Sequence, residues 1–194
     1  RAWGRSSAIY NENESIKKRF KKDKLNFNYD KKYVFLEFGY NFIPSEFSAA
    51  FAIEQIKNLK KNFQIRNKNF KFISQFLSKY NDLIEIPIQE SHIKTCWLAY
   101  PFIIKPNKLF DRNELQIFLE RKKIQTRVIF SGNILKQPLM KKKNFIRTKN
   151  CDLESNYIMK NGILIGCHHG MTKKDLLYVS DTINKFIKNK KKLN

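Results

Sequence analysis

Residues 95–104 read TCWLAYPFII, and this apolar stretch decides how the second half of the chain folds. Its length and its aromatic and β-branched content predict a β-strand. Pro101 interrupts the run and lacks the amide N–H that a β-ladder requires. We therefore expect this strand to lie at the edge of a sheet or to carry a bulge at the proline.

The segments that follow this strand predict alternating helices and strands. Asp111 and Glu114 have the spacing of a capping box, which predicts a helix that runs to about Lys122. A second strand is expected over residues 124–130 (IQTRVIF), because its residues are mostly apolar or β-branched. A basic loop is expected over residues 131–150.

The end of the chain continues the same pattern. A short helix is expected over residues 152–160, with Asn161 and Gly162 as its C-terminal cap, and a third strand over 163–165. Residues 172–175 predict the cap of a last amphipathic helix. The resulting order β-α-β-(α)-β-α describes a compact α+β domain.

A long helical stripe precedes this domain. Residues 33–38 (YVFLEF) predict a strand or a buried extended segment, and Ser45 after a proline predicts a helix start. Apolar residues then keep helical spacing from about 45 to 80, which is long for one globular helix. We therefore expect a kink or break near residues 65–69. The stripe is expected to connect the two halves of the chain.

The composition excludes several classes of protein. A chain of 194 residues with 42% hydrophobic residues can form a core, which excludes a disordered basic tail. The longest strongly apolar stretch, residues 97–104, is too short to span a bilayer, and no secretory signal is visible at the start. Cys96, Cys151 and Cys167 are scattered, which argues against a disulfide framework and a structural zinc site. We expect a cytoplasmic protein without a membrane partner.

The net charge of +22 leaves three interpretations open. Of the 39 basic residues 31 are lysine and 8 are arginine, whereas proteins that read nucleic acids favour the bidentate arginine fork. Asn, Ile, Phe, Tyr and Lys make up 99 of the 194 residues, and A/T-rich codons encode all five. We favour a solvated lysine-rich surface. A basic rim that attracts an anionic small molecule and a basic nucleic-acid-binding module remain the alternatives.

The most metal-like local cluster is His168 with His169. Adjacent residues of an extended segment point to opposite faces, so we expect no metal site here. His168 is instead expected to line a pocket or a strand exit. Cys167 beside His168 is a weaker candidate for a nucleophile.

Three further positions point to an anion site. Asn41 lies in the loop before the long helix, where its amide could reach a phosphate, although a turn asparagine is the commoner case. Arg127 lies in an otherwise apolar predicted strand, so we expect it to be at least half-buried and to need a carboxylate or a ligand phosphate. Asn133 follows at a strand exit, where ligand contacts are common. The predicted anion site thus lies around residues 39–41 and 127–133.

Several motifs together resemble one family. Residues 1–5 (RAWGR), 39–41 (GYN) and 45–50 (SEFSAA) resemble the DegT-type sugar aminotransferases, which are vitamin B6-dependent enzymes acting on nucleotide-linked keto-sugars. Residues 126–133 (TRVIFSGN) and 166–172 (GCHHGMT) look most like the branch that contains CDP-4-keto-6-deoxyglucose 3-dehydrase.

The resemblance implies an α/β fold of the aspartate-aminotransferase-like (PLP-transferase) type, of which this chain is a C-terminal fragment. Residues 1–44 would be the end of the large PLP-binding domain, 45–82 the connecting helix or helices, and 83–194 the small α+β domain. It also implies pyridoxal 5'-phosphate (PLP) or pyridoxamine 5'-phosphate (PMP) as cofactor, a homodimer with shared active sites, and a nucleotide-linked keto-sugar substrate in surface polysaccharide (lipopolysaccharide) biosynthesis.

The same resemblance implies roles for individual residues. Asn41 would bind the cofactor phosphate of the partner subunit, while Arg127, Asn133 and His168 would lie near the sugar-nucleotide pocket. The residue that decides between the two reactions, a lysine in aminotransferases or a histidine in dehydratases, is expected upstream of Arg1. The fragment alone is therefore expected to be inactive, and transamination and dehydration remain alternatives.

Two departures from the family pattern matter. The dehydrase branch carries a cysteine-rich stretch after the opening motif that helps to hold a [2Fe–2S] cluster. Residues 6–16 (SSAIYNENESI) contain no cysteine, so we predict no iron–sulfur cluster. The family usually has a basic residue two positions after the asparagine, where this chain has Ile43.

Overall fold

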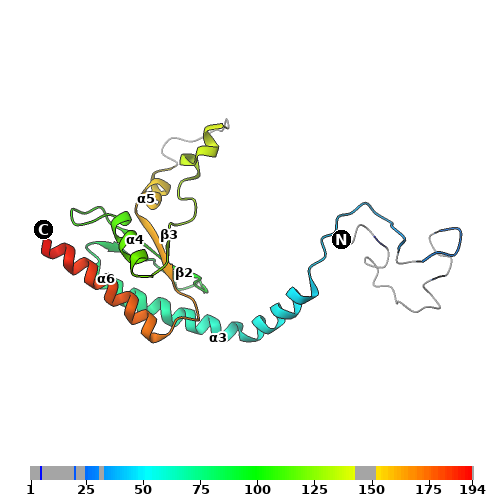
Figure 1. Cartoon of the computed structure of the whole chain (residues 1–194), viewed down its shortest axis with the longest axis horizontal. Coiled ribbons are helices and arrows are strands. Elements are labelled where there is room, and N and C mark those ends of the chain that lie inside the picture. Colours follow the sequence, from blue (N-terminus) through cyan, green and yellow to red (C-terminus); the bar gives the residue numbers. More distant parts are fainter. Residues whose placement is uncertain (1–4, 6–19, 21–24, 31–32, 143–151, 194) are drawn as a thin grey trace. The chain divides into compact units, whose positions relative to one another are not determined.

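The structure is a computed structural model that describes residues 5, 20, 25–30, 33–142 and 152–193. The chain divides into two compact units, Arg1–Lys57 and Asn58–Asn194. The division falls inside helix α3 (Glu46–Leu77), which begins directly after Ser45 as expected (Figure 1). No helix in the described part of the chain is long and apolar enough to cross a membrane.

Helix α3 runs through 32 residues without interruption, so the expected break near residues 65–69 is wrong. The helix contains neither proline nor glycine, the residues that most often interrupt one. Its C-terminal half is also held by the core, where Phe70, Ile73 and Leu77 are buried. Tertiary packing of that face stabilises the helix more than its intrinsic propensity does.

Few of the described residues upstream of α3 form regular structure. In the segment 33–38 the predicted strand is reduced to Phe35, which forms an isolated antiparallel bridge with Arg5. Val34 is buried, whereas Phe35 and Phe38 are exposed. The segment therefore lacks the second paired strand that would extend a ladder. The opening motif, apart from Arg5, and residues 6–16 lie outside the described residues.

The C-terminal unit is organised around a four-stranded antiparallel sheet with the order β1-β2-β4-β3. The strands are β1 (Ile84–Glu85), β2 (Ala99–Ile104), β3 (Thr126–Arg127) and β4 (Gly162–Gly166). The predicted strand at 95–104 is confirmed as β2, whereas β1 was not expected. The strand predicted over 124–130 is much shorter, because only its two central residues pair with β4.

Strand β2 is not the edge strand that was expected, since it lies between β1 and β4. Its register with β4 runs from Ala99 opposite Gly166 to Ile103 opposite Gly162 without a bulge. The sheet tolerates the proline because β1 pairs with Ile103 and Ile104. No strand in the described part of the chain therefore faces Pro101 on the side away from β4.

Helices cover the two faces of this sheet unequally. The C-terminal half of α3, α4 (Arg112–Arg121) and α6 (Lys173–Leu193) share one buried cluster with Tyr100, Phe102 and Ile104 of β2. Helix α5 (Leu153–Asn161) contacts β2 and β4 from the other side, where Ile158 lines a cavity with Pro101 and Ile103. Short 3-10 helices complete the unit: η3 (Ser78–Tyr80), η4 (Ile134–Lys136) and η5 (Pro138–Lys142). The predicted β-α-β-(α)-β-α order is confirmed.

Local capping interactions define the starts of the two longest helices of the C-terminal domain. Asp111 Oδ1 accepts from the Glu114 N–H (2.9 Å), and Glu114 Oε2 accepts from the Asp111 N–H (3.1 Å), which confirms the capping box. At α6, Thr172 Oγ1 accepts from the Asp175 N–H (3.2 Å), and Asp175 Oδ2 accepts from the Thr172 N–H (2.8 Å).

Gly162 ends α5, as predicted, but in extended backbone conformation (φ −82°, ψ 141°) that leads directly into β4. A Cβ atom at this position would lie 2.7 Å from Ile129 Cδ1 and 2.7 Å from the Ile158 carbonyl oxygen. The glycine is therefore required by close packing rather than by a left-handed cap.

Candidate functional site

Two of the residues that the sequence singled out, Arg127 and Asn133, lie at the exit of strand β3. Thr126 is buried, and both its N–H (2.6 Å) and its hydroxyl (2.7 Å) donate to Glu120 Oε1. These hydrogen bonds lower the pKa of the Glu120 carboxyl. They fasten the start of β3 to α4 and thereby fix which face each following side chain takes.

Arg127 is exposed, so the expectation that it is at least half-buried is wrong. Consecutive strand residues point to opposite faces, and here Thr126 takes the core side. Arg127 Nη1 donates to the Thr126 carbonyl oxygen (2.8 Å). With its amide oxygen turned toward the guanidinium, Gln125 accepts from Arg127 Nη1 at 3.2 Å. The guanidinium is thus held beside the strand while remaining accessible to an anionic ligand.

A tight turn follows this strand. The Gly132 N–H donates to the Ile129 carbonyl oxygen (3.0 Å), and both Phe130 (φ 47°) and Gly132 (φ 63°) have positive φ. A Cβ atom on Gly132 would lie 2.5 Å from Met159 Cγ, so the turn is closely packed on α5. A positive φ at a non-glycine residue costs about 1–3 kcal/mol. Phe130 nevertheless leaves 87% of its surface exposed.

Asn133 ends this turn in a buried polar network. Its side chain is 2% exposed, and Nδ2 donates to Asp152 Oδ2 (3.2 Å) and Asn156 Oδ1 (2.8 Å). Its Oδ1 accepts from the Leu135 N–H (2.9 Å) at the start of η4. The structure therefore places Asn133 inside the fold, joining the turn to α5. The sequence analysis did not identify Asp152 and Asn156 as partners of Asn133. Their only sequence signal is a spacing of four residues, which places them on the same face of a helix.

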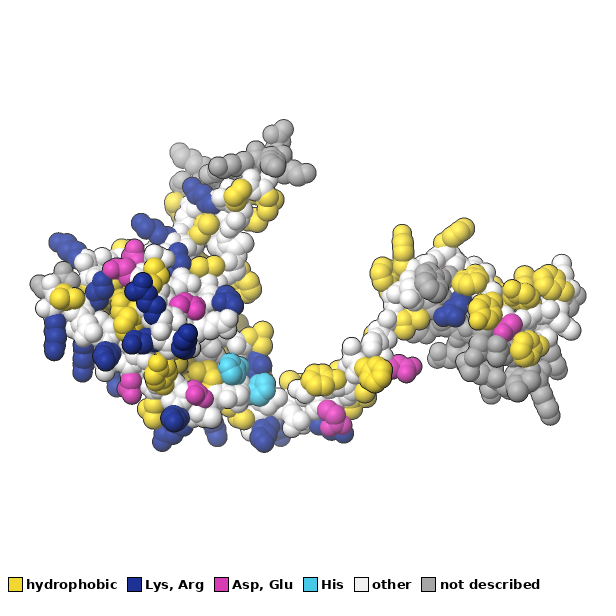
Figure 2. Space-filling view, viewed as in Figure 1, with side chains coloured by type: hydrophobic (Ala, Val, Ile, Leu, Met, Phe, Trp, Pro, Cys, Tyr) yellow, Lys and Arg dark blue, Asp and Glu magenta, His cyan; other side chains and the backbone are white. Residues whose placement is uncertain are grey.

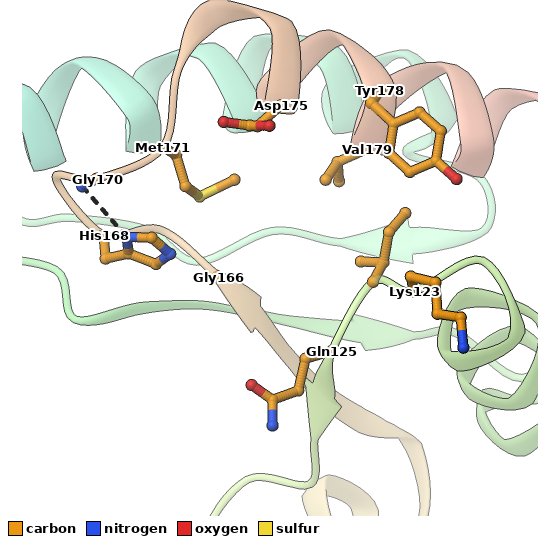
Figure 3. A pocket seen from close by; sticks show the side chains of 10 residues that line it. Lys123, Gln125, Gly166, His168, Gly170, Met171, Asp175, Tyr178 and Val179 are labelled. Carbon is orange, nitrogen blue, oxygen red and sulfur yellow. Dashed lines mark hydrogen bonds between the residues drawn. The ribbon is translucent and has the colours of Figure 1, made fainter.

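A surface cavity of about 320 Å³ lies between β3, the end of β4 and α6. In Figure 3 Met171, Asp175 and Val179 lie on one side of the cavity and Lys123 and Gln125 on the other, where their side chains point away from α6. His168 also lines the cavity, and its Nδ1 accepts from the Gly170 N–H (3.2 Å). Arg127 and Asn133 do not line it.

The segment that contains His168 and His169 contacts α3 through hydrogen bonds. Asn69 Nδ2 donates to the His168 carbonyl oxygen (2.8 Å), and Arg66 Nη2 lies 3.4 Å from His169 Nδ1. Cys167 is fully buried, and burial raises the pKa of its thiol to about 11. The thiol therefore stays protonated at neutral pH, and the candidate nucleophile is wrong. Among the described residues no cluster of three or more His, Cys, Asp or Glu side chains could hold a metal ion.

Asn41 belongs to the N-terminal unit, in an exposed loop before α3. Its amide makes no hydrogen bond within the described part of the chain, so an N–H donor is available there. A phosphate dianion is usually held by several N–H groups together with positive charge. Asn41 alone supplies one such donor, and Ile43 two residues later adds no positive charge.

Comparison with curated proteins links the chain to two related reactions. It is 32% identical to a GDP-4-keto-6-deoxy-D-mannose 3-dehydratase of Escherichia coli O55:H7, over 72% of this chain and 35% of that enzyme. It is 28% identical to the lipopolysaccharide biosynthesis protein RfbH of Salmonella typhimurium, over 81% of this chain and 36% of that protein. It is 27% identical to a UDP-4-amino-4,6-dideoxy-N-acetyl-beta-L-altrosamine transaminase of Campylobacter jejuni, over 81% of this chain and 40% of that enzyme. The chain thus matches less than half the length of each relative.

Solved structures give the same picture. An E. coli GDP-4-keto-6-deoxy-D-mannose-3-dehydratase with bound hydrated PLP superimposes with a TM-score of 0.64 at 29% identity, over 78% of this chain and 38% of that one. A GDP-4-keto-6-deoxymannose-3-dehydratase with bound GDP-perosamine superimposes with a TM-score of 0.65 at 29% identity, over 83% and 40%. The fold is therefore that of part of a PLP-dependent aminotransferase. A model of the DegT/DnrJ/EryC1/StrS aminotransferase family matches residues 6–184, and the chain belongs to that family.

Proposed function

We propose that this chain forms the C-terminal part of a PLP- or PMP-dependent enzyme that acts on a 4-keto-6-deoxy nucleotide-sugar in surface polysaccharide biosynthesis. The family match over residues 6–184 carries the proposal. The relatives catalyse either transamination or 3-dehydration of nucleotide-sugars, as their names state. The proposal includes both reactions as alternatives. It also includes a homodimer with shared active sites.

When bound, the cofactor acts as an electron sink and stabilises negative charge on the substrate carbon that is joined to the cofactor through nitrogen. In the proposed homodimer Asn41 donates its amide N–H to the cofactor phosphate in the active site of the partner subunit. Arg127 offers an exposed, oriented guanidinium to an anionic group of the substrate, for which a bidentate arginine is well suited. Asn133 holds the turn that follows Arg127, and His168 lines the neighbouring cavity.

Product analysis of the complete gene product tests the proposal. The protein is incubated with PLP, glutamate and a panel of 4-keto-6-deoxy nucleotide-sugars that differ in the nucleotide, and products are identified by mass spectrometry. An amino-sugar would establish an aminotransferase, and a 3-deoxy sugar would establish a dehydratase. Iron analysis of the same sample tests the expectation that no iron–sulfur cluster is bound. Neither product with any nucleotide-sugar would refute the proposed function.

A matched pair of arginine variants tests the substrate site. Arg127→Gln removes the exposed guanidinium at β3, whereas Arg121→Gln removes an exposed guanidinium at the end of α4. We expect Arg127→Gln to raise KM about tenfold or more, since a charge-assisted contact contributes roughly 1.5–3 kcal/mol. Arg121→Gln should leave KM unchanged. If Arg127→Gln and Arg121→Gln have the same KM, Arg127 does not bind the substrate.

A further inference from the structure

The backbone at Phe130 is better suited to glycine than to phenylalanine. In the turn closed by the Gly132 N–H and the Ile129 carbonyl oxygen, Phe130 occupies the second position with φ 47°. Ser131 is not among the described non-glycine residues with positive φ. A positive φ at the second position of a turn is favoured by glycine and costs a phenylalanine free energy.

The Phe130 side chain contributes little to the described fold. It is 87% exposed, whereas the residues on either side of it are fixed by packing and hydrogen bonds. Ile129 packs on the position of Gly162, Gly132 packs on Met159, and Asn133 is buried in its polar network. The turn therefore carries an exposed aromatic ring at a position whose backbone conformation favours glycine.

We propose that Phe130 stacks on the base of the nucleotide-sugar. This inference rests on the proposed function and names the part of the substrate that this turn recognises. An exposed aromatic ring offers a flat surface that every nucleobase can stack on. The exposed guanidinium of Arg127, three residues earlier at the same strand exit, supplies the positive charge that the adjoining phosphates require. The backbone strain stored at residue 130 is then explained by ligand binding rather than by folding.

Nucleotide binding and stability measured on the same variants test this inference. GDP, CDP, UDP and dTDP are titrated into the complete gene product by calorimetry, and the melting temperature is recorded without nucleotide. The variants are Phe130→Gly, Phe130→Trp and, as a control with a similarly exposed side chain (86%), Ile88→Gly. Phe130→Gly should weaken binding of the preferred nucleotide at least about fivefold while keeping or raising the melting temperature. Phe130→Trp should bind at least as tightly as the unmodified protein, and Ile88→Gly should bind like it.

Each other result overturns the inference. If Phe130→Gly binds the preferred nucleotide unchanged, Phe130 is not a stacking residue, although the proposed function stands. If Phe130→Gly and Phe130→Trp both lower the melting temperature, the ring packs against protein, either another segment or a second copy. If the unmodified protein binds none of the four nucleotides, the inference and the proposed function fail together.

Discussion

At the scale of single residues, burial decides the chemistry of Cys167. Its thiol is fully buried and its pKa is raised to about 11, mainly by desolvation, whereas Cys96 is half-buried. Since the thiolate is the reactive species, we expect iodoacetamide at pH 8 to modify Cys96 well before Cys167 in the native protein. Peptide mapping by mass spectrometry checks the order, and both should react after denaturation. Rapid native alkylation of Cys167 would contradict its burial.

The same thiol predicts a pH dependence of stability. Its folded pKa of about 11 exceeds the ordinary value of 9.0, so the unfolded chain loses this proton first. The contribution of Cys167 is therefore constant below pH 9 and falls as the pH rises toward about 11. Urea unfolding of the Cys167→Ala variant should show a smaller loss of stability over that range than the unmodified chain. If the unfolding free energies of the two proteins fall in parallel between pH 9 and 11, the raised pKa of Cys167 is contradicted.

Asn133 is the residue whose loss should disturb the turn most. Asn133→Ala removes three hydrogen bonds and leaves buried polar groups of Asp152 and Asn156 without this partner. We expect a loss of roughly 1–3 kcal/mol in the free energy of unfolding, measured with urea. Gln137→Ala, which removes one exposed hydrogen bond to the Ser131 carbonyl oxygen, should cost less than about 0.5 kcal/mol. Similar losses in both variants would show that the buried network is dispensable.

At the scale of elements, the capping box at α4 should act as an independent unit. Asp111→Ala removes the acceptor for the Glu114 N–H, and we expect a loss of about 1 kcal/mol in unfolding free energy. Asn113→Ala, at an exposed position in the first turn of the same helix, should be neutral or slightly stabilising, because alanine has the higher helix propensity. Thermal denaturation compares the two. An unchanged Asp111→Ala variant would mean that tertiary packing alone holds the start of the helix.

The elements also show how far local sequence signals reach. Strand β2, the cap of α4, the cap of α6 and the order of elements follow from patterns within a few residues, because caps and apolar periodicity are local. The two-residue strand β1 and the inner position of β2 depend on pairing between distant segments. The unbroken α3 likewise depends on packing of its buried face against the sheet. The first two have no local signal, whereas the absence of proline and glycine from residues 46–77 is a local signal for an unbroken α3.

At the scale of the whole molecule, the charge is spread rather than focused. Figure 2 shows lysine and arginine side chains scattered over the visible face of the C-terminal unit, with acidic side chains among them. We therefore expect weak binding to duplex DNA that disappears near 0.15 M salt, since exposed lysines exchange readily with counterions. Fluorescence anisotropy with an unrelated duplex measures it. Tight binding of the duplex at 0.15 M salt would instead support the alternative interpretation, a basic nucleic-acid-binding module.

The sequence singled out the candidate site residues but could not predict their surroundings. The motif at 126–133 and His168 were identified in the sequence, and His168 does line a cavity. The burial of Arg127 was mispredicted, because it depends on which face of β3 turns to the core, and the Glu120–Thr126 hydrogen bonds set that face. The strain at Phe130 has no sequence signal, since phenylalanine gives no hint of a positive φ.

The sequence alone determined the α+β order of the C-terminal domain and the family of the chain, because helix caps, apolar patterns and motifs are encoded in short stretches. Only the tertiary structure decided that Asn133 is a buried anchor, that Arg127 is exposed and that Cys167 is buried. Those properties depend on solvent access and on hydrogen-bond partners such as Asp152 and Asn156, which lie far along the chain from the residues they bind.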